Sequence, residues 1–132
     1  ASWMYDLPGY GLPIRGNLPL NLLRAALKGE AVRFSRNDFR GVTYVRQVIE
    51  NLEPAMDLPG GVYNFGSGNA EDMVCTARQF AKALDITVKI TEESWERNLV
   101  MDTAKLERSG IRFAATQQGI RCCLQDYGLS DL

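Results

Sequence analysis

The sequence contains no histidine, and this absence removes much of the usual catalytic and metal chemistry. Without it, no base is available to activate a serine or cysteine nucleophile. The three cysteines, Cys75, Cys122 and Cys123, form no Cys-x-x-Cys pair, and no carboxylates cluster at ligand spacing, so no metal site is predicted. An odd number of cysteines, two of them adjacent, also makes a poor disulfide framework. We expect reduced, mostly buried thiols.

Long apolar runs and a strong charge of one sign are also missing. No apolar run approaches 18 residues, and the start shows no basic stretch followed by an apolar one, so we expect no membrane span, no signal peptide and a cytoplasmic location. The 15 basic and 16 acidic residues nearly cancel, which disfavours a dedicated nucleic-acid binder. With 132 residues and 45% hydrophobic content, the chain fits one folded domain.

Five segments carry apolar residues at the spacing of an amphipathic helix. Capping residues support four of them. Asn17 precedes and Gly29 follows the first segment, and Thr43 precedes the second. Gly110 follows the fourth segment and Gly128 follows the fifth. The fourth is a short helix that begins at residue 103. The expected apolar faces of the others are Leu20, Leu23 and Leu27; Val45, Val48, Ile49 and Leu52; Met73, Val74, Ala77, Phe80, Ala81 and Leu84; and Ile120, Cys123, Leu124 and Tyr127.

Between these helices, residues 1–5, 31–34, 62–65 and 87–90 have the pattern of short strands. Strands and helices therefore alternate along most of the chain. Such alternation favours an α/β layer structure with some parallel strand pairs. We predict a single α/β domain over residues 1–132, with a small, mostly parallel or mixed sheet flanked by helices.

The glycines at 66 and 68 stand between a predicted strand and a predicted helix, where phosphate-binding turns are found. However, Glu71 and Asp72 already place negative charge at this helix end, and the third glycine of a dinucleotide fingerprint is missing. No tyrosine is followed four residues later by a lysine, so a Tyr-x-x-x-Lys pair is also missing. We therefore predict a turn with helix capping, no dinucleotide binding and no catalytic residue.

Arginines are concentrated between residues 33 and 46, where four of them accompany a single acid, Asp38. Guanidinium groups bind phosphate in bidentate fashion, so this stretch is a candidate site for a diphosphate-bearing ligand. Arg36, Arg40 and the nearby Thr43 are the candidate substrate contacts, although Thr43 could instead cap a helix. The alternative is a solvated helix face with ordinary surface arginines.

Trp3 and Tyr5 alternate on a strand end and so share one face. They could stack on a base, a sugar or a nicotinamide, or could simply pack in the core. Trp95 lies among polar residues and is interpreted as an apolar anchor under a loop. Asp102 is interpreted as a structural hydrogen-bond acceptor at a helix start.

Several motifs follow one another between residues 2 and 106. They are Ser2-Trp3-Met4-Tyr5, Asp38 to Val45, Gly61-Val62-Tyr63-Asn64-Phe65, Arg97, and Met101-Asp102-Thr103-Ala104-Lys105-Leu106. In their order and spacing the chain resembles the C-terminal half of extended short-chain dehydrogenase/reductases, and is most similar to the dTDP-4-dehydrorhamnose reductases among them. Arg40 is similar in placement to an arginine that contacts the nucleotide diphosphate in related epimerases and dehydratases.

In that family the first half binds NAD(P) on a Rossmann sheet and supplies a catalytic tyrosine and lysine, and the second half closes over the nucleotide sugar. The resemblance implies that residues 1–132 are the substrate-binding portion of an NADPH- or NADH-dependent reductase of 4-keto sugar nucleotides, without the dinucleotide-binding portion. It places Trp3 and Tyr5 near the cofactor, and Arg40 and Thr43 near the substrate. The alternatives are the corresponding portion of an epimerase or dehydratase, and a non-catalytic regulatory module that recognises a protein partner.

The same interpretation predicts how the isolated chain behaves. It should bind no cofactor tightly and show no reductase activity. Strands that lose their neighbours leave open edges and bare apolar faces, which favour association. We therefore expect self-association or a broad apolar patch around Trp3, Tyr5, Val62 and Phe65.

Overall fold

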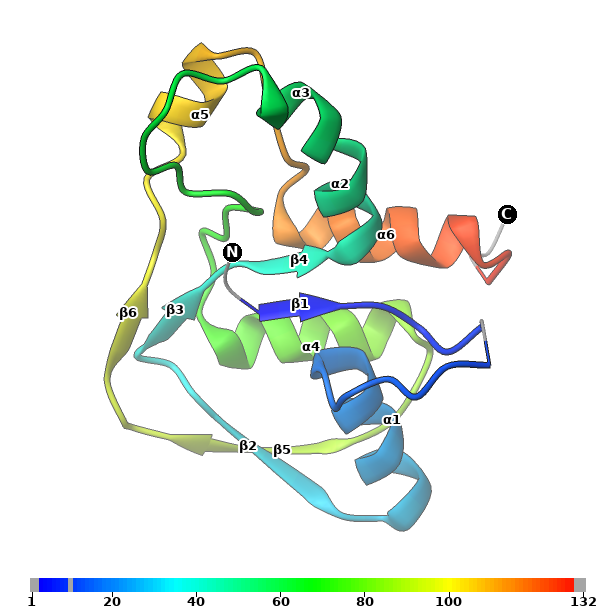
Figure 1. Ribbon diagram of the computed structural model, residues 1–132. Helices are drawn as coiled ribbons and strands as arrows, with labels where there is room; N and C mark the ends of the chain where they lie inside the picture. Colours follow the sequence, from blue (N-terminus) through cyan, green and yellow to red (C-terminus); the bar gives the residue numbers. More distant parts are fainter. Residues whose placement is uncertain (1–2, 10, 130–132) are drawn as a thin grey trace.

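A computed structural model describes residues 3–9 and 11–129, so Ser2 of the first motif lies outside the described residues. The chain forms an α/β domain in which short strands and helices alternate (Figure 1). The strands are β1 (Trp3–Tyr5), β2 (Ala31–Ser35), β3 (Asp38–Arg40), β4 (Val42–Tyr44), β5 (Lys89–Glu93) and β6 (Arg97–Leu99). The helices are α1 (Leu18–Lys28), α2 (Val45–Glu50), α3 (Leu52–Met56), α4 (Met73–Ala83), α5 (Ala104–Arg108) and α6 (Thr116–Asp126).

The strands form three parallel pairs, β1 with β4, β2 with β5, and β3 with β6. The predicted α/β class with parallel strands flanked by helices is therefore confirmed. Three of the strands, β3, β4 and β6, were not expected from the sequence. Each has only three residues, and so short a segment rarely shows a clear alternating pattern, although β1, which is equally short, lies in a segment that did.

The core lies where β1 and β4 pack against α1, α4 and α6 (Figure 1). Two aromatic rings surround that of Tyr5. Tyr44 is stacked with its centroid 5.8 Å away, and Phe80 meets it edge-on at 5.4 Å. All three side chains are buried, so this aromatic cluster fixes the two strands against α4.

The predicted face of α4 is confirmed, with Met73, Val74, Ala77 and Phe80 fully buried. The helix begins at Met73, so the acidic pair precedes its first turn instead of lying in it. Asp72 is its N-cap, and the Asp72 carboxylate accepts a hydrogen bond of 2.8 Å from the Cys75 N–H. The helix thus receives negative charge at its positive end from its own sequence.

For α1 the predicted caps are confirmed but the predicted face is wrong. The Asn17 side chain accepts a hydrogen bond from the Leu20 N–H, and Gly29 ends the helix with φ of 67°. The buried side chains are Leu18, Leu22 and Ala25, whereas Leu27 is 87% exposed. The helix has apolar residues on several sides, and only packing against α4 and β2 selects the buried one.

The second predicted helix is also different in the structure. It is divided into α2 and α3, and Thr43 lies in β4 instead of capping it. Tyr44 occupies the N-cap position without a side-chain hydrogen bond, and α2, which is described in full, has no buried residue. Ile49 is 61% exposed. Of the apolar stripe expected to be covered, Ile49 and Leu52 are exposed, whereas Val45 and Val48 are half-buried.

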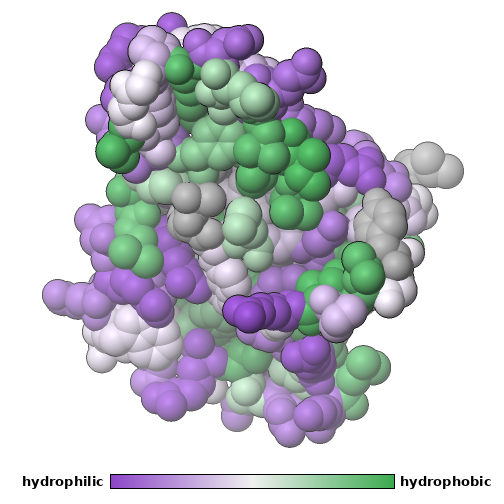
Figure 2. Space-filling view, viewed as in Figure 1, coloured by the Kyte–Doolittle hydropathy of each residue, from purple (hydrophilic) through white to green (hydrophobic). Residues whose placement is uncertain are grey.

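Figure 2 shows hydrophobic side chains gathered over α2, on the face from which β1 is seen in Figure 1. The apolar patch predicted around Trp3, Tyr5, Val62 and Phe65 is thus centred elsewhere, because Tyr5 is buried.

Residues 62–65 form no strand, which corrects another prediction. A strand needs a hydrogen-bonded neighbour, and within the described ranges none pairs with this segment. Instead, the Lys105 ammonium donates to the Val62 carbonyl at 2.9 Å, and the Asn64 amide donates to the Asp102 carbonyl at 2.9 Å. Phe65 meets Phe113 edge-on.

All three cysteines are unpaired, as predicted. Cys123 is buried, and its burial raises the pKa of the thiol to about 12, so this thiol stays protonated at neutral pH. Across residues 3–9 and 11–129, no helix combines the length and the hydropathy that crossing a bilayer requires.

Candidate functional site

Arg40 lies at the end of β3 with its guanidinium over the indole of Trp3, at 4.2 Å from the ring centroid. A second contact holds the backbone, because the Asn69 amide donates to the Arg40 carbonyl at 3.0 Å and also to the Thr76 hydroxyl in α4. The Arg40 Nε is buried and has no hydrogen-bond partner among the described residues. Arg40 is therefore held in place with a donor left unused.

Arg97 lies next to Arg40, on the strand that pairs with β3. In this parallel register Arg97 is opposite Asp38, and Leu99 is opposite Arg40. The Arg97 guanidinium donates to the Asp38 carboxylate through two nitrogens, at 3.1 and 2.9 Å. The Trp95 indole N–H donates to the same carboxylate at 3.2 Å. Asp38 is buried, and these donors satisfy its charge while fixing the position of Arg97.

We call Arg40 and Arg97 the arginine pair. Burial lowers the pKa of Arg40, the positive charge of Arg97 lowers it further, and Asp38 opposes both effects. Two arginines and one carboxylate leave the group one positive charge in excess. An anion bound against the pair would relieve the repulsion and accept hydrogen bonds from the unused donor. The chemistry of the site is therefore that of phosphate or diphosphate binding.

A hollow of about 400 Å³ lies beside β1, lined in part by Trp3, Met4, Ile14, Arg15 and Val45. Trp3 thus borders both the hollow and the arginine pair. Its ring is partly exposed, as a stacking surface must be. A ligand with a phosphate at the arginine pair could extend along Trp3 into this space.

The structure separates the other two predicted substrate contacts from the arginine pair. Thr43 is fully buried, and its hydroxyl accepts a hydrogen bond of 2.9 Å from the Ser67 N–H, so it joins β4 to the turn before α4. The Arg36 guanidinium instead makes two hydrogen bonds to Glu92, at 2.7 and 2.8 Å, and Arg78 binds the same carboxylate. Their roles in substrate binding stay predictions.

Tyr5, predicted with Trp3 as a cofactor contact, is only 2% exposed. Burial raises the pKa of its hydroxyl, and the nearby Cys123 adds to the effect. The hydroxyl lies against Gly119 of α6, where a methyl group added to the glycine would come within 3.2 Å of the hydroxyl oxygen. Tyr5 is thus a core residue of this domain, and its cofactor contact stays a prediction.

The sequence predicts a turn with helix capping at residues 66–69, but this segment ends three residues before Asp72, which caps α4 at Met73, so the cap is Asp72 and not this segment. Ser67 is buried, and its N–H is already bonded to Thr43. The carboxylate of Asp72 occupies the N-terminus of α4. A phosphate at this helix end would meet that negative charge, so the described residues here do not fit a dinucleotide.

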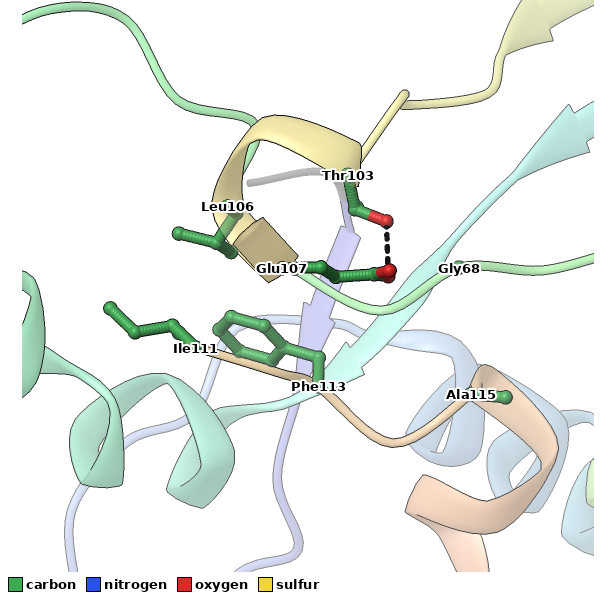
Figure 3. Close-up of a pocket in the computed structure, with 8 residues that line it drawn as sticks. Gly68, Thr103, Leu106, Glu107, Ile111, Phe113 and Ala115 are labelled. Atoms are coloured by element: carbon green, nitrogen blue, oxygen red, sulfur yellow. Dashed lines mark hydrogen bonds between the residues drawn. The ribbon is translucent and has the colours of Figure 1, made fainter. Parts of the chain in front are cut away.

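A smaller hollow of about 180 Å³ lies between α5, the same turn and the segment before α6 (Figure 3). Ile111 and Phe113 form its apolar side, and Glu107 crosses it to accept a hydrogen bond of 2.8 Å from the Thr103 hydroxyl. The carboxylate is satisfied within its own helix. No cationic side chain is among the described residues that line this hollow, in contrast to the arginine pair.

Sequence reasoning identified Arg40 but not the group around it. Asp38 was counted as the only acid among arginines, and Trp95 was interpreted as an apolar anchor. In the structure Trp95 is 37% exposed and donates to Asp38. These residues are 57 positions apart, so only the pairing of β3 with β6 brings them together. The interpretation of Asp102 as an acceptor is confirmed by its 2.9 Å bond from the Ala104 N–H.

Comparison with known proteins identifies the fold. No protein-family model matches the sequence, and no curated protein matches it. Among solved structures, dTDP-4-dehydrorhamnose reductase from Bacillus anthracis in complex with NADP matches 94% of this chain, with a TM-score of 0.76 and 13% identity. UDP-glucose 4-epimerase from Thermus thermophilus in complex with NAD matches 95%, with a TM-score of 0.65 and 20% identity.

The dTDP-glucose 4,6-dehydratase of Bacillus anthracis, in complex with NAD, also matches 95% of the chain, with a TM-score of 0.65 and 18% identity. The chain spans less than half the length of these enzymes, between 42% and 45% of each. It therefore has the fold of one part of NAD(P)-dependent reductases, epimerases and dehydratases of sugar nucleotides.

Proposed function

We propose that this chain is the substrate-binding portion of an NAD(P)-dependent reductase of 4-keto sugar nucleotides. The observation that carries the proposal is the arginine pair beside the partly exposed ring of Trp3. The diphosphate of the substrate would lie against Arg40 and Arg97. The sugar or the base would lie along Trp3, in the hollow beside β1.

Each residue has a separate task in this proposal. Arg40 supplies the unused donor, and stacking on Trp3 orients its guanidinium. The Asp38 carboxylate accepts hydrogen bonds from two nitrogens of Arg97 and so holds that guanidinium beside Arg40. One carboxylate neutralises only one of the two arginine charges. The group would bind and orient the substrate. NAD(P)H, when held by a dinucleotide-binding domain, would supply the hydride.

The reductase is preferred over the epimerase and dehydratase because two independent observations favour it. The TM-score is 0.76 with the reductase against 0.65 with each of the other two enzymes. The motifs that run from Trp3 to Leu106 are also most similar to that sub-family. The arginine pair supports the binding of a nucleotide sugar, which is the main claim, and the TM-scores and motifs support the choice of a reductase.

A titration of the isolated chain tests the central part directly. We expect UDP-glucose and dTDP-glucose to shift the NMR signals of Trp3, Arg40 and Arg97 in a saturable manner. Arg40→Ala should weaken binding at least about tenfold, because charge-assisted hydrogen bonds to phosphate contribute about 1.5–3 kcal/mol each. Arg97→Ala should have a similar effect.

Arg33→Ala is the matched control, because Arg33 pairs with Glu93 on the β2–β5 pair, away from Trp3. This variant should bind as the parent does. Arg36→Ala in the same titration decides whether Arg36 contacts the substrate. Unchanged signals with both nucleotide sugars would reject the proposal and favour a module that recognises a protein partner.

A further inference from the structure

Asn69 lies just before α4, and its side-chain amide makes four hydrogen bonds. The nitrogen Nδ2 donates to the Arg40 carbonyl at 3.0 Å and to the Thr76 hydroxyl at 2.8 Å. The oxygen Oδ1 accepts from the Glu71 N–H at 3.1 Å and from the Gln117 side chain at 2.7 Å. Four bonds are the full capacity of an asparagine amide. One side chain therefore ties the end of β3 to α4 and to α6.

The orientation of this amide follows from its neighbours. The Glu71 N–H can only donate, so it faces the Asn69 oxygen. The Thr76 hydroxyl already donates to the Asp72 carbonyl at 2.8 Å, so it accepts from the Asn69 nitrogen. The second hydrogen of that nitrogen is directed at the Arg40 carbonyl, which can only accept. A flipped amide would lose these bonds, so the donor to Arg40 is fixed by the surrounding chemistry.

The two members of the arginine pair are held in different ways. The Arg97 guanidinium is fixed by the Asp38 carboxylate through two of its own nitrogens. The Arg40 Nε has no such partner in the described part of the chain, and the guanidinium of Arg40 lies against the ring of Trp3. Attraction of a cation to a ring face is less directional than a hydrogen bond. The position of the Arg40 guanidinium therefore depends on where the Arg40 backbone lies.

Arg40 is also the residue at which the chain passes from one strand pair to another. It ends β3, which pairs with β6, and two residues later the chain enters β4, which pairs with β1. Trp3 belongs to β1, so the stacking of Arg40 on Trp3 joins two different strand pairs. The hydrogen bond from Asn69 holds the Arg40 carbonyl at this junction. A shift of the junction would move the guanidinium relative to the ring.

We propose that Asn69 is a positioning residue for the arginine pair, an inference that rests on the proposed function. Its amide holds the Arg40 backbone where the guanidinium covers Trp3 and the Nε donor stays available to a phosphate. Asn69 thereby does for Arg40, through the backbone, what Asp38 does for Arg97 through the side chain. The affinity of the site for a diphosphate depends on both supports.

Two substitutions in the isolated full chain separate positioning from stability. Asn69→Ala should move the NMR signal of the Trp3 indole N–H, because the Arg40 charge changes its place over the ring. It should also weaken UDP-glucose binding about three- to tenfold, the usual effect of one lost neutral hydrogen bond. Thr76→Val is the matched control, because it removes the other acceptor of the Asn69 nitrogen and leaves the Arg40 bond in place. It should lower the free energy of unfolding without changing the indole signal or the affinity.

Asn69→Ser is the second variant, for use if the alanine protein does not fold. A serine hydroxyl can still accept from the Glu71 N–H in the local turn, but it is too short to replace the donor to Arg40. The indole signal should move, and UDP-glucose binding should weaken, as with alanine.

Lower stability of the Asn69 variants with an unchanged Trp3 signal and unchanged affinity would overturn the proposal, because Asn69 would then be only structural. Equal changes with Thr76→Val would also overturn it, because the effect would then come from a loosened α4. A parent chain that binds no nucleotide sugar would reject the proposed function. In that case the Trp3 signal of the ligand-free variants still decides whether Asn69 positions Arg40.

Discussion

Helices α4 and α2 have similar apolar spacing in the sequence but opposite environments in the structure. Six of the eleven residues of α4 are buried, whereas none of the six residues of α2 is buried. The difference lies in their neighbours. The first helix packs against α1, α6 and the strands, and the second makes most of its contacts with α3 and β4. Apolar spacing thus marks a face that needs a cover, but the spacing does not identify the cover.

Phe80, on the buried face of α4, and Ile49, on the exposed side of α2, should respond very differently to truncation. Phe80→Ala should lower the free energy of unfolding by about 3–5 kcal/mol, because it removes a ring packed on Tyr5 and leaves a cavity. Ile49→Ala in the isolated chain should change it by less than about 0.5 kcal/mol, as is usual at exposed positions. Urea unfolding followed by circular dichroism measures both. Equal losses would show that α2 is covered in solution.

Thr43 in β4 accepts a hydrogen bond from the Ser67 N–H and so joins the strand that leads into α2 to the segment that precedes α4. Thr43→Val should cost about 1–3 kcal/mol, because the Ser67 N–H loses its buried acceptor while the side-chain volume stays similar. Thr43→Ser keeps the hydroxyl and is the control. We expect it to lose less stability than the valine variant in the same urea titration. The reverse order would mean that the methyl group, not the hydrogen bond, supports the joint.

Capping is a further difference between the two helices, since α4 has a side-chain cap and α2 has none. Asp72→Ala should cost about 1 kcal/mol by removing the acceptor for the Cys75 N–H. Asp72→Asn should restore most of this loss, because an asparagine side chain caps equally well. Thermal unfolding of the three proteins checks the order. No recovery with asparagine would assign the effect to charge near Arg36 instead.

The smallest effect lies on the exposed network around Glu92. Hydrogen bonds from Arg36 and then Arg78 lower the pKa of Glu92 from 4.5 to about 2. A lowered pKa contributes stability that is fully present above pH 4.5 and is lost as the pH falls through about 2. The melting temperature of Glu92→Gln should therefore lie slightly below that of the parent at pH 6, and the two should converge towards pH 2. Glu96→Gln, at another exposed glutamate, is the matched control.

Some residues of the candidate site were identified from the sequence, and others were recognised only in the structure. Arg40 was identified from the sequence because arginines are concentrated around it. The contribution of Arg97 required the β3–β6 pair, which aligns it with Asp38 across 59 residues. Neither β3 nor β6 was recognised as a strand from its three residues, so neither the pair nor its register could be predicted. Thr43 shows the opposite case, because a residue type that suits a helix cap lies in β4 and accepts a hydrogen bond from the Ser67 N–H instead, while its substrate contact stays a prediction.

Local chemistry in the sequence was sufficient for the α/β class, the buried face of α4, and the caps at Asn17 and Gly29. These features depend on residues within one or two turns of each other. Only the tertiary structure decided that Leu27 and Ile49 face solvent, that Tyr5 lies in the core, and that residues 62–65 form no strand. Each of those outcomes depends on whether a distant segment is present to cover a side chain or to pair with a backbone, and spacing along the chain carries no such information.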